Sequence, residues 1–182
     1  MTSLITKEEM FAEIGVDTRP DAELSCEQVI ERNLKVVEAH FHNENPDNVE
    51  KAVALYAPDI SWEAPSRGMV YTDREEVLKA YRAIFRTLAY RKTFALRRFA
   101  TETYVFDDQV AYTKLVGDPD DMPNIPFVRG QEMSTRLVHC FEMRDGLIAR
   151  ELVYEVWRHK GAPNDHDFIP EGTPEEIFPE FD

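Results

Sequence analysis

The feature that most constrains the fold of this 182-residue chain is a change in hydrophobic periodicity near Lys92. Before this residue, apolar side chains recur every three or four positions, which is the pattern of amphipathic helices. After it, apolar and polar residues alternate, which is the pattern of half-buried strands. Because helices come first and strands come second, we expect an α+β domain with an antiparallel sheet.

Capping signals predict where the helices begin. Three segments have the capping-box pattern, in which a hydroxyl residue precedes Glu or Gln by three positions. These segments are Thr6–Glu9, Ser25–Gln28 and Thr72–Glu75. Asp47 can cap one further helix. The helix that follows Ser25 must end near Asn45, because Pro46 disfavours helical geometry at the residue before it.

Alternating segments predict the strands. They are Ile60–Ala64, Phe94–Phe99, Thr103–Phe106, Val110–Val116, Gln131–Met143 and Leu147–Trp157. Asp107–Gln109 is interpreted as the turn between two of them, since Asp is common in turns. Arg144–Gly146 is a clearer hairpin signal, because an Asp-Gly pair favours the tight turns of hairpins.

The chain is long enough for one domain with its own core. We expect residues 1–24 to be an appendage with a short helix, residues 25–158 to form the domain, and residues 159–182 to be an acidic, proline-rich tail, solvated and partly disordered. The net charge of −14 argues against nucleic acid or an anionic membrane as a partner. Cys26 and Cys140 lie far apart in the sequence, which predicts two reduced thiols. No signal peptide or membrane span is recognisable, so a cytoplasmic location is expected.

One helix end carries two histidines in the segment "EAHFHNEN", residues 38–45. His40 and His42 differ by about 200° around a helix, so they cannot share one face. His40 lies beside the apolar stripe, and we expect His42 to face solvent. His40 and Glu44 have i,i+4 spacing, but two ligands without a third are weak evidence for a metal. We therefore predict no metal site.

Several segments together resemble the SnoaL-like branch of the nuclear transport factor 2-like superfamily, which includes polyketide cyclases and is related to ketosteroid isomerases. The segments are Leu55-Tyr56-Ala57, Trp62-Glu63-Ala64-Pro65, Gly68, and the Asp145-Gly146 hairpin followed by Ile148. The resemblance covers about residues 27–158. It implies a cone-shaped barrel in which a curved sheet surrounds an apolar pocket, helices cover the pocket, and two copies form a homodimer, sheet against sheet.

The resemblance also implies site residues. Ketosteroid isomerases carry their catalytic aspartate on the first strand just before a proline, and Ala64 stands at that position here. Their acidic oxyanion-hole residue corresponds to His139. His40 can take the place of a tyrosine that reaches the pocket from the first long helix. We expect burial in an apolar cavity to favour the neutral form of His139, which is either an acid/base group or a satisfied core residue.

Other side chains are expected to shape the pocket. Trp62 points the same way as Ala64, either as core or as the wall of a pocket for a cyclic ligand. Val37 and Phe41 face the pocket from the helix. Tyr154 is predicted to present its phenol inside, because on an alternating strand it shares its face with the apolar residues Ile148, Leu152 and Val156.

Two functions remain open at this stage. In the first, the chain is a cofactor-free enzyme that isomerises, cyclises, dehydrates or hydrates a small apolar or cyclic molecule, with His139, His40 and Tyr154 as its catalytic groups. In the second, it is a non-catalytic module that uses the same cavity to bind a ligand or a protein. The missing carboxylate at Ala64 favours the second function, and an inward-facing pair of histidines favours the first.

Overall fold

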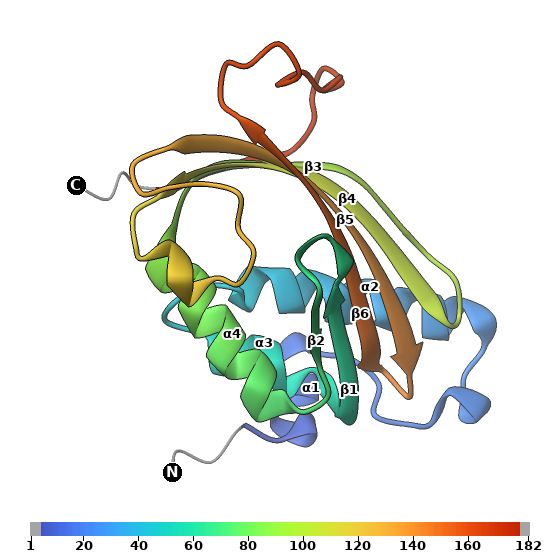
Figure 1. The fold of residues 1–182 in the computed structure, drawn as a ribbon. Helices are drawn as coiled ribbons and strands as arrows, with labels where there is room; N and C mark the ends of the chain where they lie inside the picture. Colours follow the sequence, from blue (N-terminus) through green and yellow to red (C-terminus); the bar gives the residue numbers. More distant parts are fainter. Residues whose placement is uncertain (1–4, 179–182) are drawn as a thin grey trace.

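The computed structural model describes residues 5–178, which form four helices packed against a curved sheet (Figure 1). The helices are α1 (Lys7–Ile14), α2 (Cys26–Asn43), α3 (Val49–Ala54) and α4 (Arg74–Thr87). The strands are β1 (Tyr56–Ala64), β2 (Met69–Tyr71), β3 (Leu88–Ala100), β4 (Tyr104–Leu115), β5 (Glu132–Arg144), β6 (Leu147–His159) and β7 (Glu175–Ile177). Short 3-10 turns cover Asp21–Glu23, Pro65–Arg67 and Pro119–Asp121.

The helix starts follow the capping signals closely. The boxes at Thr6 and Ser25 both form, with the side chain and backbone hydrogen bonds that define the motif. Helix α4, predicted from the third capping box, begins one residue later than expected. Asp73 rather than Thr72 is its N-cap and accepts a hydrogen bond from the backbone nitrogen of Glu76. Helix α3 is likewise preceded by Asn48 rather than Asp47.

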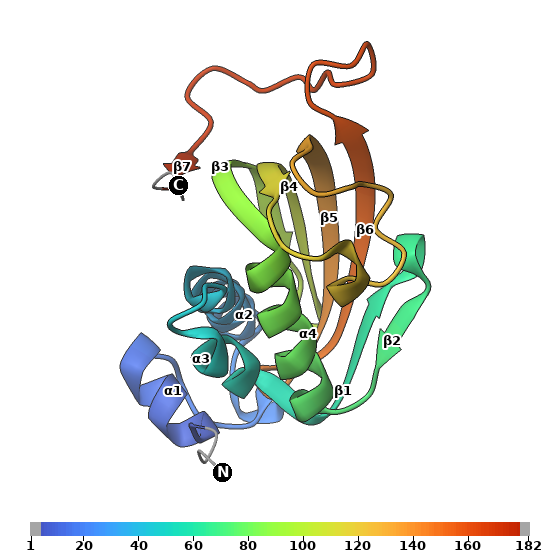
Figure 2. The same ribbon diagram turned by 60° about the vertical axis from the view of Figure 1, so that its left-hand side comes forward.

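The strands lie side by side in the order β2-β1-β6-β5-β4-β3-β7. All neighbouring pairs are antiparallel except β1 and β6, which are parallel. Figure 2 shows the helices on one side of the sheet, which curls around them but stays open between β2 and β7. The α+β class is confirmed, and the cone is a curved open sheet. Among the described residues, no helix is both long and apolar enough to cross a membrane.

The main core lies between the helices and the inner face of the sheet. Helix α1 belongs to it, since Met10 and Phe11 are fully buried. The first helix is therefore part of the core and not an attachment to it. On the sheet side, Phe141 and Val153 pack toward the same cluster.

The predicted turn at Asp107–Gln109 is wrong. Strand β4 runs without interruption through these residues, and the chain turns earlier, at residues 101–103. Asp107 and Asp108 are buried inside the sheet because arginines on neighbouring strands neutralise them. Arg98 on β3 contacts Asp107 at 2.8 Å, and Arg136 on β5 forms a two-pronged pair with Asp108.

A β-bulge at Ala149 reverses the alternation of strand β6. Met143 pairs with Ile148, but the next residue of β5, Glu142, pairs with Arg150, so Ala149 is an extra residue. An extra residue changes which side chains face the core from that point onward. Glu151 and Val153 consequently face inward, whereas Tyr154 faces outward and is 51% exposed.

The tail after β6 is described as far as residue 178 and contacts the sheet at two places. It first crosses the outer face of the sheet, where Asp167 binds Arg136 at 2.8 Å and Arg158 at 2.5 Å. It then adds β7 to the edge of the sheet beside β3. Arg136, which is partly buried, and Arg158, which is buried, thus hold the acidic tail in place. Residues 179–182 lie outside the described residues.

Candidate functional site

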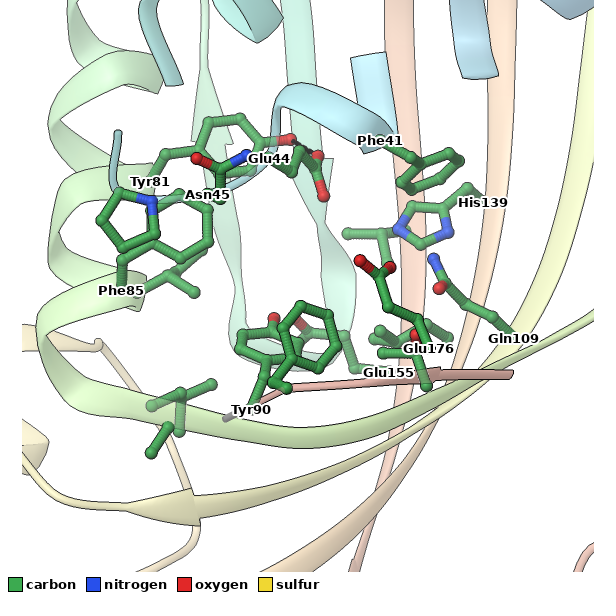
Figure 3. Close-up of a pocket in the computed structure, with 18 of the residues that line it drawn as sticks. Phe41, Glu44, Asn45, Tyr81, Phe85, Tyr90, Gln109, His139, Glu155 and Glu176 are labelled. Carbon is green, nitrogen blue, oxygen red and sulfur yellow. Dashed lines mark hydrogen bonds between the residues drawn. The ribbon is translucent and has the colours of Figure 1, made fainter. Parts of the chain in front are cut away.

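A cavity of about 330 Å³ lies between helices α2 and α4, the inner face of the sheet and the end of the tail. Figure 3 shows His139, Gln109 and Glu176 on one side of it and Tyr81 and Phe85 on the other. Most of the remaining lining is apolar or aromatic. It includes Phe41, Trp62, Ile84, Leu88, Tyr90, Leu137, Val153 and Phe178. This mixture of apolar walls and a few polar groups is typical of small-molecule sites.

His139 lies on the inner face of β5 and lines the cavity. Directly opposite on β4 is Asp107, whose Oδ1 is 3.7 Å from His139 Nδ1. Burial lowers the pKa of His139, but the carboxylates of Asp107, Glu151 and Glu44 raise it, and the net pKa is above the usual value. The pKa of His139 is thus shifted toward the charged form, opposite to the direction expected from burial alone. Because Nδ1 faces Asp107, Nε2 is the nitrogen left to meet a ligand.

Glu151 is a carboxylate that the sequence pattern did not reveal. It lies on the inner face of β6, is 1% exposed and lines the cavity. The Tyr56 hydroxyl donates a hydrogen bond to its Oε2, and His40 Nε2 lies 3.5 Å from the same atom. Burial raises the pKa of Glu151, but hydrogen bonds and the charges of His40 and His139 lower it below the usual value. Glu151 is thus a buried, ionised carboxylate.

His40 is fully buried behind the cavity and is absent from its lining. Its Nδ1 donates to the backbone oxygen of Ala52 at 3.2 Å, and its Nε2 lies 2.8 Å from Glu44 Oε1. Burial lowers the pKa of His40, but Glu44 and Glu151 raise it by more, so that the net pKa is about 10. The expectation that both histidines line one cavity is therefore wrong for His40. Instead, His40 contacts two carboxylates that line the cavity, Glu44 and Glu151. His42 is exposed, as expected.

Two tyrosines connect these groups. The hydroxyl oxygens of Tyr56 and Tyr81 lie 2.9 Å apart, and Tyr81 donates to Glu44 Oε1 at 2.6 Å. Burial first, and then the charges of Glu151 and Glu44, raise the pKa of both phenols well above the usual value, so both stay protonated. Tyr81 and Glu44 line the cavity, and Tyr56 lies behind it.

Four other predicted pocket residues divide into two groups. Trp62 and Phe41 line the cavity. Val37 and Ala64 are fully buried but belong to the core and not to the lining. Ala64 offers only a methyl group where the isomerases carry a base. Tyr154 lies on the outer face, so the prediction of an inward phenol is wrong.

A buried carboxylate lies on the strand next to β1. Glu151 is paired in register with Trp62, two residues before Ala64. Only the Ala149 bulge places Glu151 inward, and a bulge leaves no clear sequence signal in an otherwise alternating strand. Asp107 was missed for a different reason, because an Asp-Asp pair looks like a turn.

Among the described residues, His40, Glu44 and Glu151 form the grouping that could hold a cation, with one ligand atom each within 4.8 Å of one another. In the structure these atoms bond to each other and to the two tyrosines. In the structure the cluster therefore forms an ion-pair network. That the protein needs no metal stays a prediction.

The protein thus has a curved sheet covered by helices on one side and, between them, a largely apolar cavity with a few charged groups. A family model described as the SnoaL-like domain matches residues 37–151, well over half of the chain. The chain belongs to this SnoaL-like family. No curated protein matches it.

Solved structures agree on the fold. A candidate polyketide cyclase from Xanthomonas campestris pv. campestris superposes with a TM-score of 0.58 at 20% identity, covering 69% of this chain and 91% of that one. A candidate ketosteroid isomerase from Kribbella flavida has a TM-score of 0.53 at 17% identity, covering 82% and 97%. An LEH-like epoxide hydrolase from M. tuberculosis has a TM-score of 0.53 at 14% identity, covering 70% and 84%. Likenesses at this identity show the fold alone, and the three names differ in chemistry.

Proposed function

We propose that this SnoaL-like protein binds a small, largely apolar or cyclic molecule in its cavity and catalyses a proton transfer on it without a cofactor. The observation that carries the proposal is that His139 and Glu151 lie on adjacent strands and line one cavity. The pKa of His139 is raised above its usual value and that of Glu151 is lowered below its usual value, so each group is shifted toward its charged form. Titratable groups held in opposite protonation states are the usual arrangement for acid/base catalysis.

The two groups have different roles in this proposal. Among residues 5–178, the structure shows no hydrogen bond to Oε1 of Glu151, so this oxygen can accept a proton from a ligand. His139, protonated and backed by Asp107, can donate a proton or a hydrogen bond to an oxygen or nitrogen of the ligand. Such a pair serves isomerisation, cyclisation or dehydration, because each moves a proton from carbon while charge develops on a heteroatom.

A non-catalytic binding module is the second candidate. The methyl group of Ala64, in place of the isomerase base, favours it. The two candidates share the cavity and differ in whether Glu151 removes a proton. An experiment on proton removal therefore separates them.

Base-promoted ring opening of nitrobenzisoxazole is a suitable probe, since this flat bicyclic molecule needs only a base near its acidic C–H. The base takes the proton from carbon, the nitrogen–oxygen bond breaks, and a coloured cyanonitrophenolate forms. We expect the full-length protein to accelerate this reaction. Glu151→Gln should lower kcat/KM about a hundredfold, and His139→Gln by about tenfold or more.

Glu142→Gln is the matched control, since Glu142 lies on β5 outside the cavity lining, and its kcat/KM should equal that of the wild type. Circular dichroism and a thermal unfolding curve would show that each variant is folded. If the folded Glu151→Gln variant kept the wild-type rate, the proposed base would be wrong. Binding of the probe without any acceleration would support the non-catalytic module.

A further inference from the structure

The tail supplies two side chains to the cavity. Strand β7 pairs Glu176 with Thr93 of β3, and both residues line the cavity. Phe178, two residues on, lines it as well, whereas Ile177 between them is 67% exposed. This is the alternation expected of a strand. Both residues lie beyond the segment that matches the SnoaL-like family model.

The tail is fixed at this place by several independent contacts. The backbone nitrogen of Ala95 donates to Pro174 O at 3.1 Å, and that of Phe178 donates to Arg91 O at 3.0 Å. Lys92 Nζ binds Glu175 Oε2 at 2.7 Å on the other side of the strand. Glu176 is thereby held with its side chain directed into the cavity, as Figure 3 shows.

The cavity has an excess of negative charge. Its lining contains four carboxylates, namely Glu44, Glu151, Glu155 and Glu176. Glu155 is neutralised by a bidentate pair with Arg67, and Glu44 and Glu151 share the imidazolium of His40. His139 adds one positive charge to the lining when it is protonated, and the charge of Glu176 is then the one left in excess. Among the described residues, no ion pair involves Glu176. A ligand carboxylate or phosphate would therefore be repelled, and a cation would be attracted.

Aromatic rings line the cavity both beside Glu176 and on the side opposite it. The rings of Phe178 and Tyr90 lie 5.8 Å apart, and those of Tyr81 and Phe85 are stacked at 6.1 Å. All four line the cavity together with Trp62. Aromatic faces beside a carboxylate are a common environment for an alkylammonium group, because the faces of the rings attract its positive charge.

We propose that Glu176 and Phe178 contact the ligand and select one that carries an alkylammonium group. This inference rests on the proposed function only in assuming that the cavity binds a ligand. Phe178 and Tyr90 supply the apolar contact, and Glu176 supplies the charge. Proton transfer by Glu151 and His139 then takes place on the part of the ligand that lies deeper in the cavity.

Two probes of the same shape test the inference. Phenyltrimethylammonium and its uncharged counterpart tert-butylbenzene differ in one atom, and their dissociation constants can be measured by Trp fluorescence or calorimetry. We expect the wild-type chain to bind the cation about tenfold more tightly than the neutral compound. Glu176→Gln should remove most of this preference, and Phe178→Leu should reduce it.

Glu171→Gln is the matched control, because Glu171 is an exposed acid of the same tail outside the cavity. Its preference for the cation should equal that of the wild type. Equal affinity for both probes, or a preference that Glu176→Gln leaves unchanged, would overturn the inference while leaving cavity binding intact. Failure of both probes to bind would count against the inference, and the nitrobenzisoxazole reaction would still report on the proposed function separately.

Discussion

Glu44, His40 and Glu151 show how single residues keep charge inside an apolar core. Each carboxylate would lose its charge if it were buried alone. His40 lies between them and is itself oriented by a hydrogen bond to Ala52 O. One buried histidine therefore contacts two cavity-lining carboxylates. In this way a residue that does not touch the cavity determines its charge.

This arrangement predicts a pH dependence of stability. The pKa of His40 is raised from 6.5 to about 10 in the folded state. Its contribution is therefore complete below the unfolded pKa of 6.5 and is lost as the pH rises through about 10. Urea unfolding should show that the free energy of unfolding falls between pH 7 and 10, by an amount on the order of a few kcal/mol, and that His40→Gln falls less.

The matched control is His42→Gln, since His42 is exposed on the same helix. Its pH dependence should follow that of the wild type. Parallel curves for the wild type and His40→Gln would show that His40 carries no charge in the folded protein.

At the scale of elements, the sequence predicted most helix starts and the order of helices and strands. Capping boxes and periodicity are local signals, and Thr6 and Ser25 form the caps as expected. The site was less predictable. His139 could be placed inward by simple alternation on β5, but Glu151 could not, because the bulge at Ala149 is determined by the pairing of β6 with β5. The role of Asp107 depends on Arg98 from another strand, which is also a long-range contact.

Gly117 illustrates a tertiary constraint on one element. It follows β4 where the chain passes the end of α4, and its backbone nitrogen donates to Thr87 O at 3.1 Å. A Cβ at this position would lie 2.5 Å from Arg86 O and 2.8 Å from Thr87 Cα, both backbone atoms. Gly117→Ala should therefore lower the free energy of unfolding by about 2 kcal/mol or more, as measured by urea denaturation.

Gly161→Ala provides the comparison, because its Cβ would meet no atom within 4 Å and only its positive φ opposes the change. That cost is about 1 kcal/mol. A Gly117→Ala variant as stable as Gly161→Ala would show that the α4 end and the loop after β4 can move apart easily.

At the scale of the molecule, the outer face of the sheet has one part that the tail covers and one part that is uncovered. The tail covers one part through Asp167, and the other part exposes a group of apolar side chains. These are Phe99, Tyr104, Tyr154 and Val156, each about half exposed. We propose that this uncovered part is the contact in a homodimer. Sedimentation should then give twice the subunit mass of 21.1 kDa.

Tyr154→Glu should shift the protein toward the monomer, because the substitution would bury two like charges in the contact. Val70→Glu is the control, since Val70 is similarly exposed on β2. A monomeric wild-type chain, or equal effects of the two substitutions, would contradict the proposed contact.

The central claim is that a protonated His139 and an ionised Glu151 face the same cavity, and NMR titration of the His139 ring tests it most directly. The account predicts a His139 pKa above 6.5 in the wild type, because Asp107, Glu151 and Glu44 outweigh burial. Glu151→Gln and Asp107→Asn should each lower that pKa, and Glu142→Gln should not. A wild-type pKa below 6.5 that neither Glu151→Gln nor Asp107→Asn changes would contradict the account.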